Sequence, residues 1–149
     1  MADMFDNGDA LRIQDLMARY AWLLDMGDMD GLMALFDESA VFQDTSGVEY
    51  RGKEAVRRYF TGLTTSPAFR GRQHHIDAFV LEPTADGYSA RSYWTVTKWR
   101  ASDGVKMVEV VGRAFDRFRA TADGWRIVER RVYHWRDADC PWHPGGTAV

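Results

Sequence analysis

Two residues of this chain could together form a general base: Asp25 in the stretch 20–28 and His74 in the stretch 70–77. An imidazole that is hydrogen-bonded to a carboxylate is held in one tautomer and can take up a proton near neutral pH. Each residue also has an ordinary interpretation, a solvated helix end for Asp25 and a packed or surface histidine for His74. The elements that position the two residues decide between these interpretations.

Arg130 is a second candidate because its place in the predicted strand 125–135 indicates an inward side chain. It shares the parity of Val128 and Val132, and a buried guanidinium needs an anionic partner. The ordinary alternative is an ion pair at a strand edge or an interface. Aromatic side chains could form the walls of a pocket for a cyclic substrate, although core packing explains them equally well. The residues that we expect at the substrate are Tyr20, Tyr50, Trp94, Lys98 and Trp99.

Other kinds of catalytic site find little support in the sequence. His74 and His75 are neighbours on a predicted strand, so their side chains point to opposite faces and cannot readily share one metal ion. The single cysteine, Cys140, lies in a proline-flanked segment without an obvious base, which disfavours a thiol nucleophile. A nucleophile elbow and a glycine-rich nucleotide loop are both missing. We therefore expect neither a metal nor a cofactor.

The composition is typical of one globular domain. The chain has 149 residues, 46% of them hydrophobic, and a formal net charge of −3 from 19 basic and 22 acidic residues. No basic block suggests nucleic-acid binding, and no apolar run reaches the roughly 20 residues of a membrane helix. The acidic amino terminus is unlike a signal peptide, so we expect a cytoplasmic protein.

The first third of the chain has the periodicity of helices. Apolar residues at spacings of three and four predict a helix from an Asp9 N-cap to Gly27, and Asp28 caps a second, short helix. Strands are predicted at 40–43 and 48–51, followed by a helix at 53–63. The apolar residues that we assign to the buried side of the second helix are Leu32, Met33, Leu35 and Phe36.

The rest of the chain has the period-two pattern of strands joined by short turns, which predicts an antiparallel meander. Helices followed by strands indicate an α+β fold, here one domain over 1–149 with its core at about 9–136 and an irregular tail at 137–149. Parity places His74 with Ile76, Ala78 and Val80, so both faces of the sheet carry apolar groups and we expect a homo-oligomer. The predicted strands are 72–81, 88–100, 105–120 and 125–135.

These elements and several short motifs together resemble the SnoaL-like branch of the nuclear-transport-factor-2-like superfamily. The motifs lie at 13–20, 24–32 and 52–56, at His74, and at 123–127, where Asp-Gly-Trp-Arg-Ile opens the last strand. The resemblance implies a cone-shaped α+β barrel, in which a strongly curved antiparallel sheet wraps around the helices and a pocket lies at the open end. One fold hosts many functions, so the resemblance is more specific for the fold than for the activity.

Several lyases of this superfamily, namely scytalone dehydratase, bile-acid dehydratases and hexachlorocyclohexane dehydrochlorinase, carry an Asp–His pair in the pocket. The resemblance places Asp25 and His74 on that pair, Tyr20 on a tyrosine of the bile-acid enzymes, and Arg130 on a pocket arginine. The sequence departs from scytalone dehydratase, which has a second histidine where 96–99 has none, and from the dehydrochlorinase, which has a lysine near Tyr20. Sequence inspection identifies no second inward acid of the kind that the cyclases and ketosteroid isomerases use.

The resemblance therefore implies a cofactor-independent lyase of the dehydratase type, acting on a small cyclic or polycyclic substrate in a homodimer or homotrimer. His74 would be the base, Asp25 its orienting partner, and Arg130 or Tyr20 the group that stabilises negative charge. Two alternatives stay open. One is a non-catalytic ligand-binding or assembly subunit, like the β subunits of ring-hydroxylating dioxygenases. The other is an isomerase or cyclase that uses the same base.

Overall fold

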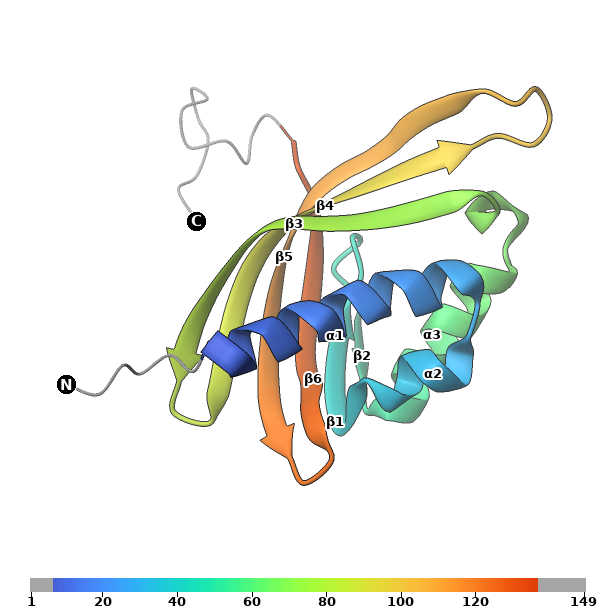
Figure 1. Ribbon diagram of the computed structural model, residues 1–149. Helices are drawn as coiled ribbons and strands as arrows, with labels where there is room; N and C mark the ends of the chain where they lie inside the picture. Colours follow the sequence, from blue (N-terminus) through green and yellow to red (C-terminus); the bar gives the residue numbers. More distant parts are fainter. Residues whose placement is uncertain (1–6, 137–149) are drawn as a thin grey trace.

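The computed structural model describes residues 7–136, in which the helices come first and the long strands last (Figure 1). The amino-terminal part holds α1 (Asn7–Met26), α2 (Met29–Ala34), α3 (Lys53–Thr65) and a 3-10 turn, η1 (Pro67–Phe69). Two short strands, β1 (Phe36–Gln43) and β2 (Glu49–Arg51), lie between α2 and α3. The long strands are β3 (Arg72–Thr84), β4 (Gly87–Trp99), β5 (Lys106–Thr121) and β6 (Gly124–His134).

One six-stranded sheet in the order β2-β1-β6-β5-β4-β3 forms the wall of the fold. Strands β3 to β6 pair with their sequence neighbours in antiparallel fashion, as their short turns predicted. The β1–β6 pair is parallel, which the predicted all-antiparallel sheet did not include. Parallel neighbours need a long crossover between them, and here α3 and three long strands separate β1 from β6 along the chain.

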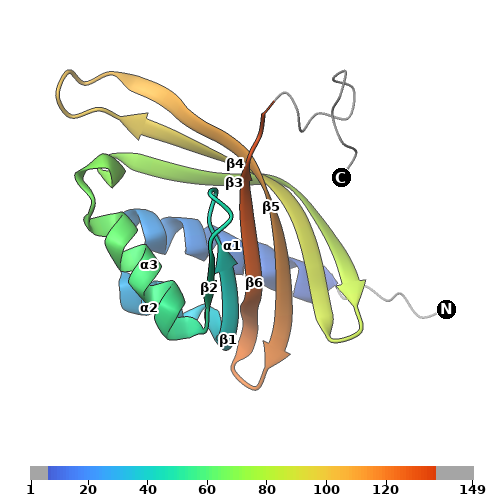
Figure 2. The same ribbon diagram turned by 180° about the vertical axis from the view of Figure 1, so that it is seen from behind.

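The three helices lie on the concave side of this strongly curved sheet, and both views show α1 running across that face (Figures 1 and 2). The predicted apolar stripe of α1 faces the sheet, with Ile13 fully buried and Leu24 only 1% exposed. The α+β cone is thus confirmed. Its core consists largely of side chains from α1, α3 and the inner face of the sheet, among them Leu16, Met17, Tyr20, Val56, Phe60, Ala90, Val96, Phe118 and Ile127.

Three helix boundaries differ from the prediction, one of them because α3 extends to Thr65 instead of ending at residue 63. Helix α1 already begins at Asn7, so Asp9 lies in the first turn, where it accepts hydrogen bonds from Arg12 (3.0 Å) and from the indole of Trp125 (3.1 Å). Phe36 is the first residue of β1, and its ring packs into the core 6.0 Å from that of Phe60. The chain leaves α1 as predicted, because Gly27 has a φ of 71° and Asp28 caps α2 by accepting from Gly31 N at 2.9 Å.

Two β-bulges change the strand parity that the sequence predicted. In β3 the pairing jumps from Asp77–Tyr93 to Val80–Arg91, and Ala78 adopts a φ of 47°. The extra residue turns Phe79, not Val80, toward the core, where its ring contacts Phe118. A second bulge, in β6, leaves Val128 as the extra residue without a partner in β5, since Ile127 pairs with Phe118 and Glu129 with Arg117. Arg130 follows the second bulge and has the inward direction that the sequence predicted. His74 precedes the first bulge and also faces inward, a direction that strand parity left open between His74 and His75.

The outer face of the sheet carries exposed apolar side chains, including Tyr93 (50% exposed) and Val108 (62%). The expected homo-oligomer stays a prediction. Within residues 7–136 no helix is long and apolar enough to cross a membrane. The predicted irregular tail and Cys140 lie outside the described residues.

Candidate active site

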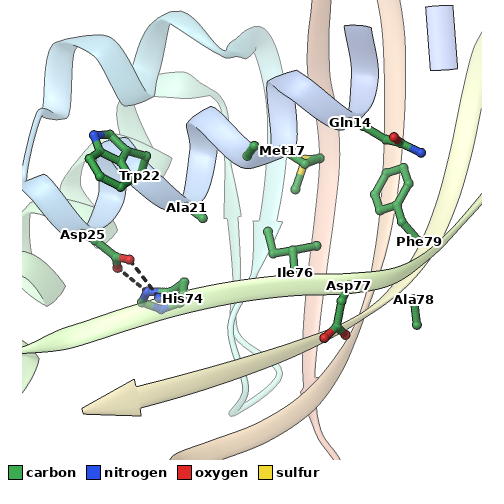
Figure 3. A pocket seen from close by; sticks show the side chains of 11 residues that line it. Gln14, Met17, Ala21, Trp22, Asp25, His74, Ile76, Asp77, Ala78 and Phe79 are labelled. Atoms are coloured by element: carbon green, nitrogen blue, oxygen red, sulfur yellow. Dashed lines mark hydrogen bonds and ion pairs between the residues drawn. The ribbon is translucent and has the colours of Figure 1, made fainter. Parts of the chain in front are cut away.

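Asp25 and His74 meet at the place where α1 passes over the start of β3 (Figure 3). The Asp25 carboxylate accepts the backbone N–H of His74 through Oδ2 (2.8 Å), and its Oδ1 lies 2.6 Å from Nδ1 of the imidazole. Both side chains are largely buried, with exposed fractions of 13% for His74 and 10% for Asp25. This two-point contact fixes the position and the rotation of the imidazole ring.

The local sequence explains why the contact forms. Asp25 occupies the last turn of α1, which has no basic residue, so the helix dipole there disfavours a negative charge. The two donors of His74 offset that unfavourable field. The His74 ring also stacks on Phe69 of η1, with centroids 5.9 Å apart and planes inclined by 27°.

The contact has a chemical consequence for the tautomer of His74. A carboxylate accepts hydrogen bonds only, so the neutral imidazole carries its proton on Nδ1 and presents an unprotonated Nε2. Among residues 7–136 no side chain or backbone group is hydrogen-bonded to this Nε2. The nitrogen is thus available to take a proton from a bound molecule.

A cavity of about 230 Å³ inside the cone adjoins His74. Its walls come from α1, α3 and all the strands except β2, which brings residues far apart in sequence around one small volume. The lining residues include Tyr20, Leu24, Phe42, Tyr59, Phe60, Arg72, His74, Trp94, Val96, Arg130, Val132 and His134. On the other side of the dyad, a groove between α1 and β3 exposes Trp22 and Asp77 (Figure 3).

Arg130 is held in this cavity by a buried acid, Asp116 of β5. Nη1 of Arg130 donates to both carboxylate oxygens at 2.7 Å, and the side chains are 2% and 0% exposed. Burial raises the pKa of Asp116, and the neighbouring guanidinium offsets this only in part. Burial by itself would lower the pKa of Arg130, but Asp116 outweighs that effect and raises it. A guanidinium keeps its proton in proteins, and both oxygens of Asp116 accept hydrogen bonds from it, which is the geometry of an ion pair.

Tyr20 completes this buried group. The guanidinium carbon of Arg130 lies 4.6 Å from the centroid of the Tyr20 ring, a cation–π contact between two buried side chains. Burial raises the pKa of Tyr20, although Arg130 opposes the rise. The Tyr20 hydroxyl therefore stays protonated at neutral pH and can donate a hydrogen bond.

Strand register sets the relative depth of these groups in the cone. Trp94, Gly112 and His134 lie side by side on three adjacent strands, next to the row that holds His74 and Val96. Arg130 lies four residues from His134 along β6, which corresponds to about 13 Å along the strand. The backbones of His74 and Arg130 are thus well separated along the sheet, whereas the two side chains line the same cavity.

Three of the predicted substrate-binding residues do not line this cavity, and only Trp94 and Tyr20 do. The Tyr50 hydroxyl donates to Asp44 (3.2 Å) on the far side of Tyr59. Lys98 has the expected parity, but its ammonium donates to the carbonyl of Ala68 at 2.7 Å. Trp99 has the opposite parity and is 48% exposed.

Sequence reasoning missed Asp116 and His134. Asp116 alternates with Ala114 and Phe118 in a strand pattern that buries every second residue, the same signal that identified Arg130. His134 ends β6 at the edge of the cavity, 6.3 Å from the Trp94 ring. In the described part of the chain, no cluster of three or more His, Cys, Asp or Glu residues could hold a metal ion.

Comparison with known proteins agrees with this architecture. The family model described as a SnoaL-like domain matches residues 8–131. No curated protein was found to match the chain.

Solved structures share the fold at low sequence identity. Aln2 from a Streptomyces species is 24% identical with a TM-score of 0.79, over 89% of this chain and 94% of that one. A proposed aromatic ring hydroxylase from Novosphingobium aromaticivorans is 28% identical (TM-score 0.73, 89% and 93% covered). A proposed dehydratase of the NTF2-like family from Streptomyces avermitilis is 14% identical (TM-score 0.77, 88% and 99% covered).

Proposed function

This chain belongs to the SnoaL-like domain family, and we propose that it is a cofactor-independent lyase that eliminates water from a small cyclic substrate. The observation that carries the proposal is the two-point contact between Asp25 and His74 at the wall of an internal cavity. An oriented histidine beside a cavity that could hold a small molecule suits proton abstraction better than it suits a purely structural role.

The proposed reaction begins when Nε2 of His74 takes a proton from a carbon next to a carbonyl group. The Asp25 carboxylate stabilises the imidazolium that results, as the orienting acid does in a catalytic triad. Negative charge develops on the carbonyl oxygen, where Arg130 and the protonated Tyr20 hydroxyl stabilise it. The carbon–oxygen bond to the neighbouring hydroxyl then breaks, and His74 returns its proton to the departing oxygen. Water and an unsaturated ring compound leave.

The proposal can be tested before a substrate is known, because proton abstraction alone exchanges hydrogen for deuterium. We expect the protein to catalyse deuterium uptake from D2O at the carbon next to the carbonyl of cyclic ketones, followed by NMR. His74→Ala should lower the rate by about 100- to 10,000-fold, the usual contribution of a positioned base. Asp25→Asn should also lower it strongly, because the amide no longer stabilises the imidazolium.

His75→Ala is the matched control, since His75 is adjacent, exposed, and hydrogen-bonded only to Thr97 (2.9 Å) among the described residues. Its exchange rate should equal that of the parent protein. Full activity of His74→Ala would rule the mechanism out.

Two other functions give different results in this experiment. A ligand-binding or assembly subunit, a role that fits the similarity to a proposed ring hydroxylase, predicts no exchange in any variant. An isomerase or cyclase predicts exchange that depends on His74. It releases no water from β-hydroxy ketones, whereas the proposed lyase yields conjugated ketones that absorb in the ultraviolet.

A further inference from the structure

We propose that the cavity beside His74 takes a neutral, single-ring compound with a carbonyl or hydroxyl oxygen, and that it rejects carboxylates and fused-ring compounds. This inference names the substrate class of the proposed function and rests on that function for the identity of the site. It derives from the charge, the donors and the size of the cavity.

The charge argument begins with Arg130, which by itself would suggest an anchor for a carboxylate. Its positive charge is already neutralised by Asp116, with both oxygens at 2.7 Å and neither side chain open to solvent. The second cation of the lining, Arg72, lies 2.6 Å from Glu109. Asp25 adds a further carboxylate beside His74. The ammonium of Lys98 also lies 3.4 Å from Glu109, so the three acids of this site are balanced by three cations. A carboxylate that entered the cavity would lose its hydration without meeting an uncompensated positive charge.

The hydrogen-bonding argument points to a neutral oxygen. Nε of Arg130 is buried and has no hydrogen-bond partner among the described residues, although Arg130 lines the cavity. The Tyr20 hydroxyl, whose pKa is raised by burial, is a second donor at the same place. The Tyr20 hydroxyl is neutral, and the charge of Arg130 is already compensated by Asp116. Such donors suit the oxygen of a ketone or an alcohol, because this oxygen accepts hydrogen bonds and is itself uncharged.

The size argument sets the number of rings. A cavity of about 150 Å³ holds benzene, and drug-sized ligands occupy about 300 Å³ or more. The volume here, about 230 Å³, lies between these values and fits one ring with one or two small substituents. Of the cyclic and polycyclic substrates that the sequence led us to expect, the volume of the cavity favours the single-ring compounds.

Trp94 keeps the volume fixed. Its indole donates to the carbonyl of Arg113 at 3.0 Å and lies flat over Gly112, where a β-carbon would stand only 2.5 Å from the ring. A side chain that is hydrogen-bonded at its tip and packed over backbone cannot rotate away to admit a second ring.

The test compares three probes of graded charge and size by isothermal titration calorimetry at pH 7: phenol, benzoate and 2-naphthol. We expect phenol to bind at least tenfold more tightly than benzoate and than 2-naphthol. Val132→Phe, which fills the cavity from β6, should abolish phenol binding and so locate it. Benzoate binding as tight as phenol, or phenol binding too weak to measure, would overturn the inference.

A charge variant sharpens the test. Asp116→Asn frees the charge of Arg130 at nearly unchanged volume, and benzoate should then gain at least tenfold in affinity while phenol changes little. Asp86→Asn is the control, because Asp86 is exposed and lies 3.3 Å from Arg117 on the surface. If Asp116→Asn does not fold, the comparison of the three probes on the parent protein still decides the question.

The two proposals can fail separately. Tight phenol binding without deuterium exchange would overturn the lyase and leave the ligand class standing. Exchange that depends on His74, together with a preference for benzoate, would overturn the ligand class and leave the base standing.

Discussion

The buried pair of Asp116 and Arg130 allows a quantitative prediction about stability. Replacing Asp116 by Leu leaves a guanidinium in a place where it is only 2% exposed and has lost its anion. Removing one partner of a buried pair costs about 3–5 kcal/mol. For a domain of this size, each kcal/mol lowers Tm by about 2–4 °C, so the variant should melt about 6–20 °C below the parent.

The opposite single variant, Arg130→Met, should behave differently because a carboxyl group can take up a proton. Burial already raises the pKa of Asp116, and the loss of Arg130 removes what opposes the rise. A group whose pKa is raised in the folded state contributes stability at low pH and loses it as pH rises. Arg130→Met should therefore be most stable in mild acid and weaken toward neutral pH. A guanidinium cannot lose its charge by titration in this pH range, so the stability lost in Asp116→Leu should depend little on pH.

The double variant Asp116→Leu/Arg130→Met replaces the pair by apolar side chains, a change that is often neutral or stabilising. It does lose the contact of Arg130 with Tyr20, which is worth about 0.5–2 kcal/mol. We expect it within about 2 kcal/mol of the parent, so the two singles should couple by about 3 kcal/mol or more. Urea unfolding of all four proteins at pH 5 and pH 7.5 measures the cycle. Additive effects of the two substitutions, or an Asp116→Leu cost below about 1 kcal/mol, would refute this reasoning.

Two further predictions concern other parts of the fold. Hydrogen bonds from Ser39, together with Arg119, lower the pKa of Asp37 from 3.8 to about 2, so its contribution is present above pH 4 and is lost as pH falls toward 2. Asp37→Asn should cost about 1–2 kcal/mol at pH 7, an amount reduced for solvent screening, and much less at pH 2; an equal cost at both pH values would contradict this. Gly112→Ala places a β-carbon 2.4 Å from the carbonyl oxygen of Tyr133 and 2.5 Å from Trp94, so it should destabilise by about 1–3 kcal/mol and weaken phenol binding. Gly62→Ala in α3, with open space around the new carbon, should stabilise by about 0.5–1 kcal/mol, and similar thermal shifts for both glycine variants would contradict the packing argument.

The sequence predicted most elements of the fold because their signals are local. The apolar stripe of α1 and the turns between the long strands depend on residues close together in the chain. What it did not predict arises from pairings between distant segments. The parallel contact of β1 with β6 depends on how the chain closes the cone, and the bulge at Ala78 depends on how β3 bends against β4.

The same distinction holds for the site. Strand parity separated His74 from His75 but did not decide which of the two faces the pocket. The contact of His74 with Asp25 joins a helix end to a strand start, and only the resemblance to a family indicated it. Lys98 shows the limit of parity, since a side chain with the expected direction is held by the carbonyl of Ala68. Asp116 could have been found by the parity rule that identified Arg130. It was missed because an acid in a strand is usually exposed.

The two acids of the site share a physical feature that bears on the proposed chemistry. Asp25 lies where a helix dipole disfavours its charge, and Asp116 lies where burial does. Replacing Asp116 together with Arg130 by apolar residues should cost the fold little, because the acid and its partner each offset the unfavourable position of the other. Local choices that work against stability are expected where function requires them. Asp25 holds His74 and Asp116 holds Arg130, and both held side chains line one cavity. The proposed reaction needs a base and a charge-stabilising group fixed around one small molecule. The two unfavourably placed acids fix the two side chains that would fill these roles.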